Sequence, residues 1–234
     1  MYFQIDYRAM TLREERKQQT RQSLLDAALR LAAGGRSLAG LSLREVTREA
    51  GVVPTAFYRH FADMDELALA IVDEVGLTLR RLLREARVQA LGSPHFAIQN
   101  SVQIFLAFVR QNPRAFEVLA QERGGAHARV REAINREVRY FVGELAEDLR
   151  LFPPMSGFPA EDREMIADLV INTALTHAGE ILQLPQNEKR GQSRREQDLI
   201  VRIIKQIRLI FLGAAHWQAE RGAVRLEEPA RKSG

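Results

Sequence analysis

Several features that define common protein classes are missing from this sequence. None of its 234 residues is cysteine, which excludes a disulfide framework, a thiolate zinc site and a cysteine nucleophile. The first ten residues, MYFQIDYRAM, lack the basic segment and apolar run of a secretory signal, and no stretch approaches the roughly 18 consecutive apolar residues of a membrane span. We therefore expect a soluble cytoplasmic protein without a membrane partner.

Catalytic motifs and strand signals are also missing. The sequence contains no glycine-rich phosphate loop, no His-Glu-x-x-His motif and no Gly-x-Ser-x-Gly elbow, and no nucleophile, base and orienting residue can be assembled from neighbouring positions. We therefore expect neither an enzyme nor a bound cofactor. Asn-Gly and Asp-Gly hairpin turns are absent, and the β-branched residues lie within 3.6-residue patterns. These patterns predict an all-α fold.

The net charge of +4 is concentrated near one end of the chain. Residues 11–60 contain nine Lys and Arg against five Asp and Glu, whereas residues 61–234 contain 24 of each. A basic module on a neutral body is typical of a protein that binds a polyanion at one end. A solvated basic helix without a partner is the alternative interpretation.

Residues 11–66 have the pattern of a helix-turn-helix DNA-binding domain. Ser42 and Glu45 form a capping-box sequence that predicts the start of a short helix, and Gly51 ends it. A proline at the first helical position predicts a second short helix over 54–61. A glycine at the turn lets two helices cross steeply, which leaves the second free to enter a major groove.

The second short helix and the one before it carry candidate DNA contacts. The polar face of the second helix consists of Thr55, Tyr58, Arg59 and His60. Their hydroxyl and imidazole groups suit phosphate oxygens, and Arg59 suits a guanine edge or a phosphate. Arg44 and Arg48 lie four residues apart on the preceding helix, where they either contact DNA or form solvated pairs with Glu45 or Glu49.

The pattern also predicts the remaining helices. The expected long helices cover residues 13–33, from Asp63 or Asp65 to about 90, 95–111, 113–121, about 130–149, 161–184 and 195–221. We expect residues 67–222 to form a helical effector-binding and dimerisation domain, and residues 1–10 and 223–234 to be flexible.

The N-terminal segment resembles the TetR family of transcriptional repressors over Arg16 to Leu67. Within that family, SLREVTREAGVVPTAFYRHFADMDELALAIVDE is most similar to the FabR- and DesT-type repressors of unsaturated fatty acid synthesis. A fainter likeness continues through FxxFVRQNPRAFxxLxxER, which spans 105–123. The resemblance implies a homodimer on palindromic operator DNA, with a long-chain acyl-CoA as the effector in the C-terminal domain.

The resemblance also implies which residues contact DNA. The positions that it assigns to phosphate or base contacts are Ser42, Arg44, Thr55, Tyr58, Arg59 and His60. Many family members have a lysine that contacts phosphate where Met64 stands. We therefore expect this contact to be missing here or replaced by another residue.

The candidate effector site is less sharply indicated. Five apolar residues line either an acyl-chain pocket or a simple core, namely Phe105, Phe108, Phe116, Phe141 and Leu145. Arg123 binds an acidic head group or caps its own helix. His177 and Glu180 lie three residues apart, but no second pair accompanies them, so we expect a polar pair and no metal. His177 is also a candidate ligand-binding residue.

Apolar stripes on the last two helices predict the dimer. One stripe contains Ala167, Val170, Ile171, Ala174 and Leu175, and the other contains Ile200, Ile203, Ile204, Ile207, Ile210, Phe211 and Ala214. We expect the surplus apolar surface to pair with a second copy in a four-helix interface.

The expected function is that of a repressor in which the effector shifts the tilt or separation of two DNA-binding heads through the helix that follows them. A repressor that responds to a different hydrophobic molecule, such as a drug, is the alternative within the same class. A dimeric scaffold without affinity for DNA would leave the basic N-terminal residues unexplained.

Overall fold

The computed structural model describes residues 12–89, 94–152, 155–184 and 194–217. These residues form helices and connecting turns without a β-strand, which confirms the all-α prediction. The first elements are α1 (Leu12–Ala32), the 3-10 helix η1 (Leu38–Gly40), α2 (Leu43–Glu49), α3 (Pro54–Phe57) and α4 (Met64–Gln89). The later elements are α5 (Pro94–Gln111), α6 (Pro113–Arg123), α7 (Ala128–Leu149), the 3-10 helix η2 (Met155–Gly157), α8 (Ala160–Leu182) and α9 (Arg194–Trp217).

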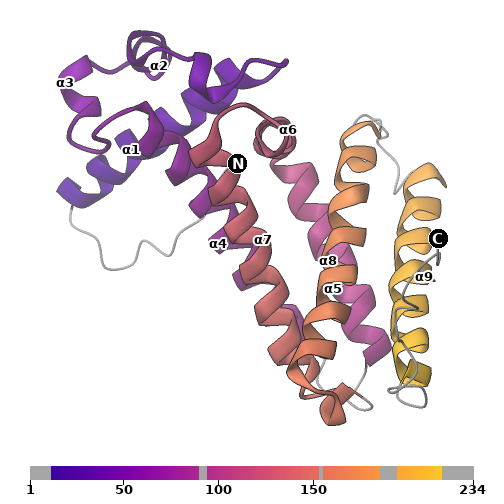
Figure 1. The fold of residues 1–234 in the computed structure, drawn as a ribbon. Helices are drawn as coiled ribbons and strands as arrows, with labels where there is room; N and C mark the ends of the chain where they lie inside the picture. Colours follow the sequence, from indigo (N-terminus) through magenta and orange to yellow (C-terminus); the bar gives the residue numbers. More distant parts are fainter. Residues whose placement is uncertain (1–11, 90–93, 153–154, 185–193, 218–234) are drawn as a thin grey trace, which may run out of the picture.

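Helices α1, α2 and α3 form an N-terminal head at one end of the molecule (Figure 1). We use "head" for residues 12–63 and "body" for the described residues from 64 onwards. The head packs around a small apolar core, whose fully buried members include Leu24, Val46 and Phe57. Leu67, from the second turn of α4, completes this core. The predicted boundary after residue 66 therefore falls inside a continuous helix.

The start of α2 confirms the predicted capping box. The Ser42 hydroxyl accepts a hydrogen bond from Glu45 N at 3.3 Å, and Ser42 N donates to Glu45 Oε2 at 2.9 Å. Hydrogen bonds that the backbone N and the hydroxyl of Ser42 donate to the Glu45 carboxylate, with a further one from Arg36, lower the pKa of Glu45 to about 2. Gly51 ends the helix with a φ of 70°, in the left-handed region that favours glycine.

Helix α3 is shorter than predicted: it ends at Phe57, whereas the predicted end is near Phe61. His60 N donates to the carbonyl of Phe57 at 2.8 Å, which turns the chain toward α4. The turn places Phe61 in the core, 5.6 Å from the Phe57 ring between centroids. Asp63 then caps α4, since its Oδ1 accepts from Glu66 N at 2.8 Å.

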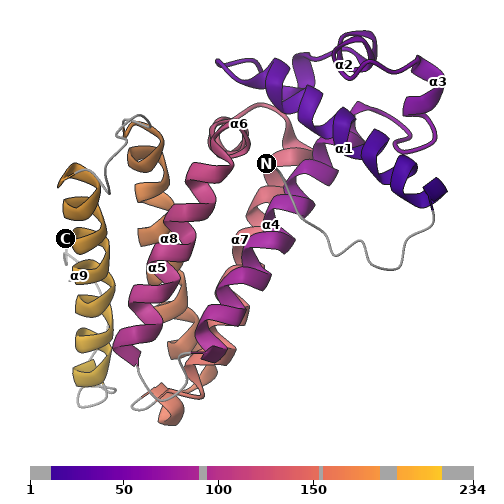
Figure 2. The same cartoon turned by 180° about the vertical axis from the view of Figure 1, so that it is seen from behind.

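The body is a layered bundle that α4 joins to the head. Helices α4 and α7 pack together, α5 and α8 form the next layer, and α9 covers the far side (Figure 2). The other predicted helix ends lie within a few residues of the observed ones. The predicted extension of α9 to 221 and the expected flexibility of residues 1–10 and 223–234 fall wholly or partly outside the described residues. Among the described helices, none is long and apolar enough to cross a membrane.

Hydrogen bonds to α6 also connect the head to the body. Glu122, near the end of α6, is 1% exposed, and its Oε1 accepts hydrogen bonds from Ser37 Oγ at 2.8 Å and Leu38 N at 2.6 Å. Within the body, Asp65 Oδ1 at the start of α4 lies 3.0 Å from His127 Nε2 beside the α6–α7 turn. The head therefore meets the body at α4 and at the C-terminal end of α6.

We expect Glu122→Ala to destabilise the protein by about 1–3 kcal/mol, because the buried donors of Ser37 and Leu38 lose their acceptor. Urea unfolding measures this change. Glu117→Ala is the matched control, since Glu117 is an exposed residue on the same helix. Equal unfolding midpoints for the two variants would contradict the assignment.

Candidate functional site

The exposed side of the head carries the predicted DNA-contacting residues. Six of them, Ser42, Arg44, Arg48, Thr55, Tyr58 and Arg59, are exposed, while Phe57 and Phe61 are buried beneath them. Tyr58 is 63% exposed, and its ring packs edge-on against Phe57 with 5.7 Å between centroids. This contact orients the tyrosine while its ring stays largely in solvent.

The glutamates of α2 do not neutralise its exposed arginines. Arg36 Nη2 lies 3.1 Å from Glu45 Oε1, and Arg30 Nε lies 2.7 Å from Glu49 Oε1. Within the described residues, Arg44 and Arg48 have no ion-pair partner. The alternative in which these two arginines pair with Glu45 or Glu49 is therefore wrong, and their charge faces solvent.

His60 is less exposed than its neighbours. Its Nδ1 is buried without a hydrogen-bond partner among the described residues. Burial, and then the positive charges of Lys17, Arg21 and Arg59, lower the pKa of His60. The lowered pKa favours the neutral imidazole at pH 7 in the protein without DNA.

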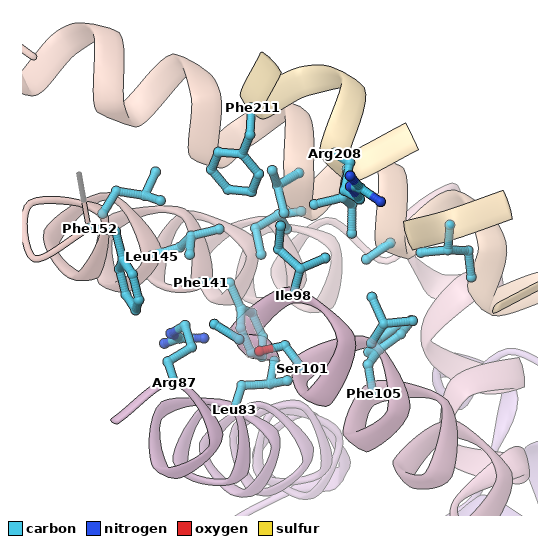
Figure 3. Close-up of a pocket in the computed structure, with 18 of the residues that line it drawn as sticks. Leu83, Arg87, Ile98, Ser101, Phe105, Phe141, Leu145, Phe152, Arg208 and Phe211 are labelled. Carbon is cyan, nitrogen blue, oxygen red and sulfur yellow. The ribbon is translucent and has the colours of Figure 1, made fainter. Parts of the chain in front are cut away.

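The body contains a cavity of about 450 Å³. Helices α4, α5, α7, α8 and α9 all contribute to its wall (Figure 3). Three of the predicted effector-site residues line it: Phe105, Phe141 and Leu145. Its volume lies within the range of roughly 300–1,000 Å³ that is usual for small-molecule sites.

The wall of the cavity is apolar except at three residues. These are Arg87 on α4, Ser101 on α5 and Arg208 on α9. Arg87 is buried and its Nε donates to Asp148 Oδ2 at 2.5 Å. Ser101 Oγ is buried without a hydrogen-bond partner among the described residues. The cavity therefore suits an apolar ligand with few polar groups.

Four predicted effector-site residues lie away from this cavity. Phe108 and Phe116 pack edge-to-face at 5.9 Å in the core next to it, and Phe116 also packs against Phe105 at 6.2 Å. Arg123 is exposed at the end of α6 and donates to Asn172 Oδ1 at 3.4 Å. No carbonyl of its own helix accepts from its side chain in the described structure, so nothing there makes it a cap.

His177, the fourth of these residues, forms a polar pair. Its Nδ1 lies 2.7 Å from Glu180 Oε1, and its Nε2 lies 2.6 Å from Gln206 Oε1. Both ring nitrogens therefore have partners. The described part of the chain contains no cluster of three or more residues suited to hold a metal ion.

Several wall residues were missed because they were assigned to the dimer interface. Val170, Ile171, Ala174 and Leu175 of α8, with Ile203, Ile207 and Phe211 of α9, line the cavity. The prediction that these residues form the surface that binds a second copy is therefore corrected. Other apolar side chains of these helices lie outside the cavity wall and are exposed, namely Met165, Leu169, Val201 and Leu209.

Two family models match successive parts of the chain. The model described as "Bacterial regulatory proteins, tetR family" matches residues 24–71, which include the C-terminal part of α1, all of α2 and α3, and the start of α4. The model described as "Tetracyclin repressor-like, C-terminal domain" matches residues 94–207. The second range contains most of the cavity wall.

Similar folds occur in solved structures of bacterial regulators. A transcriptional regulator from Pseudomonas aeruginosa PAO1 has 18% identity and a TM-score of 0.66, with coverage of 91% of this chain and 98% of its own. A regulator from Rhodococcus sp. RHA1 has 22% identity and a TM-score of 0.62, with coverage of 84% and 96%. The fatty acid degradation regulator FadR from Bacillus halodurans has 14% identity and a TM-score of 0.59, with coverage of 83% and 95%. At these identities the likeness shows the fold alone.

We expect Tyr58→Phe to weaken DNA binding by about 1 kcal/mol, or roughly fivefold, because the ring stays on Phe57 while a phosphate loses its hydroxyl donor. Fluorescence anisotropy with duplex DNA measures the change. Tyr140→Phe is the matched control, since Tyr140 is a half-exposed tyrosine on α7 of the body. If both variants bind as tightly as the wild type, Tyr58 does not contact DNA through its hydroxyl.

Proposed function

Because this chain belongs to the TetR family of bacterial regulatory proteins and is a transcriptional regulator of that type, we propose that it represses genes of unsaturated fatty acid synthesis. It binds a palindromic operator as a homodimer, and a long-chain acyl-CoA in the body changes its affinity for that operator. Two features support the proposal: the resemblance of segment 42–74 to FabR- and DesT-type repressors, and the apolar cavity.

The observation that carries this proposal is the physical connection between the cavity and the head. Leu79, Leu83 and Arg87 line the cavity from α4, and the N-terminal turns of the same helix complete the core of the head. An occupant that displaces the far end of α4 therefore tilts the head. The free energy for this change comes from the difference in ligand affinity between the two arrangements.

A second connection runs through α6. Phe105 lines the cavity and packs against Phe116 of α6 at 6.2 Å, and α6 continues to Glu122, which accepts hydrogen bonds from η1 of the head. Straight and bent acyl chains would fill the space beside Phe105 differently. Saturated and unsaturated acyl-CoAs should therefore favour different orientations of the head.

The test is binding to the DNA upstream of the gene itself and of neighbouring lipid-metabolism genes, measured by fluorescence anisotropy at several salt concentrations. We expect tight, salt-sensitive binding that saturated and unsaturated acyl-CoAs shift in opposite directions. Ala174→Phe, which adds volume to the cavity wall, should keep the affinity for DNA and lose the response to acyl-CoA.

The outcomes of this test separate the alternatives. Specific binding that ignores acyl-CoAs but responds to an uncharged hydrophobic drug would leave a regulator with a different effector. Specific binding with an unchanged response in Ala174→Phe would place the effector outside the cavity. The absence of specific binding at any salt concentration would contradict repression at these genes.

The homodimer is supported by apolar side chains that the body leaves uncovered. Met165 and Leu169 of α8 and Leu209 of α9 are each close to half exposed or more, and Leu209 reaches 70%. A second copy that covers these residues would bury them in an interface of helices from both copies. The two-fold axis would also place two heads about 34 Å apart or slightly more, which matches successive major grooves on one face of DNA.

We expect Leu209→Glu to convert the dimer to a monomer and to weaken operator binding by about tenfold or more, because a single head contacts one half-site. Light scattering coupled to size-exclusion chromatography measures the mass. Leu77→Glu is the control, since Leu77 is an equally apolar residue that is 63% exposed on α4. A Leu209→Glu variant that keeps the mass of the wild-type dimer would contradict this interface.

A further inference from the structure

The most exposed part of the cavity wall lies on α9. Among the described residues that line the cavity, the exposed ones are Arg208, Leu212 and Ala215, all on α9. The lining residues of α8 are half-buried, and those of α4 and most of those of α5 and α7 are buried. A ligand therefore reaches solvent beside α9, and its inner end points toward α4.

The two arginines of the wall come from opposite sides of the body. Arg87 belongs to α4 and Arg208 to α9, which lie on different sides of the bundle (Figures 1 and 2). In Figure 3 their labelled side chains lie on different sides of the group of lining residues. An elongated ligand therefore meets one cation near its inner end and the other near its outer end.

The inner cation is already neutralised. Arg87 is buried and donates to Asp148 at 2.5 Å, so the pair has no net charge. An acidic ligand group at this place would compete with Asp148 and leave a partly buried carboxylate without its partner, which is costly. The inner end of the cavity therefore favours an uncharged, apolar part of the ligand.

The outer cation is free to bind an anion. Arg208 is exposed, and within the described residues it forms no hydrogen bond or ion pair. An acidic group beside Arg208 stays close to water and loses little hydration, while it gains charge-assisted hydrogen bonds from a guanidinium that presents several donors.

We infer that the ligand of this cavity is an anionic amphiphile whose acidic head group binds Arg208 at the α9 rim and whose apolar chain extends inward toward α4. Arg208 is then the residue that selects acidic ligands over neutral ligands of equal length. This inference rests on the proposed effector cavity. The carboxylate of a fatty acid and the phosphates of a coenzyme A thioester share the required chemistry.

Calorimetric binding to the full-length protein tests the inference with three probes of equal chain length: dodecanoate, dodecan-1-ol and dodecanoyl-CoA, each below its micellar concentration. We expect the wild type to prefer an anionic probe to dodecan-1-ol. Arg208→Gln should weaken binding of that anionic probe by about tenfold and leave the affinity for dodecan-1-ol unchanged. The probe that responds identifies a carboxylate or a phosphate as the group bound.

Two control variants locate the effect. Lys205→Gln removes the same charge from an exposed residue of α9 that does not line the cavity, and we expect less than about a twofold change. The double variant Arg87→Gln with Asp148→Asn removes both charges of the inner pair, and we expect it to keep the preference for anions. Equal losses in Arg208→Gln and Lys205→Gln would show a general charge effect and overturn the inference.

The remaining outcomes separate this inference from the proposed function. Equal affinity of the wild type for the anionic probes and dodecan-1-ol would overturn the role of Arg208 and leave the cavity as a site for apolar ligands. Loss of the preference in the double variant alone would place the head group at α4 and overturn the assignment. Binding of no probe, or binding that Ala174→Phe leaves unchanged, would contradict the proposed effector cavity itself.

Discussion

The continuity of α4 from the head to the cavity is the constraint on which the rest of the structure depends. Its N-terminal turns bury Leu67 and Ile71 in the apolar core that includes the head, and its C-terminal turns present Leu83 and Arg87 to the cavity. A helix of 26 residues spans roughly 39 Å at its usual rise per residue. In the proposed mechanism, a displacement of α4 at the cavity is transmitted along this helix. It then changes the angle at which the exposed residues of α2 and α3 are presented.

A half-buried ion pair joins α4 to α7. Arg80 Nη1 lies 2.9 Å from Glu137 Oε2, and the Arg80 guanidinium also packs over the Tyr140 ring. Gly76 makes room for this pair, since a Cβ there would lie 2.1 Å from Glu137 Oε2. Burial raises the pKa of Glu137, so the pair is costly to form. Its contribution is therefore to the register between the two helices more than to stability.

The sequence predicted local features well and long-range ones poorly. The capping box of Ser42 and Glu45 was predictable because both partners lie within one turn. The early end of α3 was not, because it depends on the burial of Phe61 in a core made by distant helices. The roles of Arg87 and Arg208 carry no local signal either. The partner of Arg87 lies 61 residues away, and the exposure of Arg208 depends on how α9 packs.

The assignment of the cavity-lining residues of α8 and α9 to a dimer interface was wrong for the same physical reason. It also has a consequence for regulation. An apolar stripe shows which side of a helix avoids water, but it does not distinguish a cavity wall from an interface with a second copy. In this fold α8 and α9 present different residues to the cavity and to solvent: Ile171 and Ile207 line the cavity, while Leu169 and Leu209 are exposed. A ligand in the proposed effector cavity would therefore contact α4, which enters the head, and also α8 and α9, which carry the proposed dimer interface. In the proposed mechanism, one ligand would change both the tilt of each head and the distance between two heads.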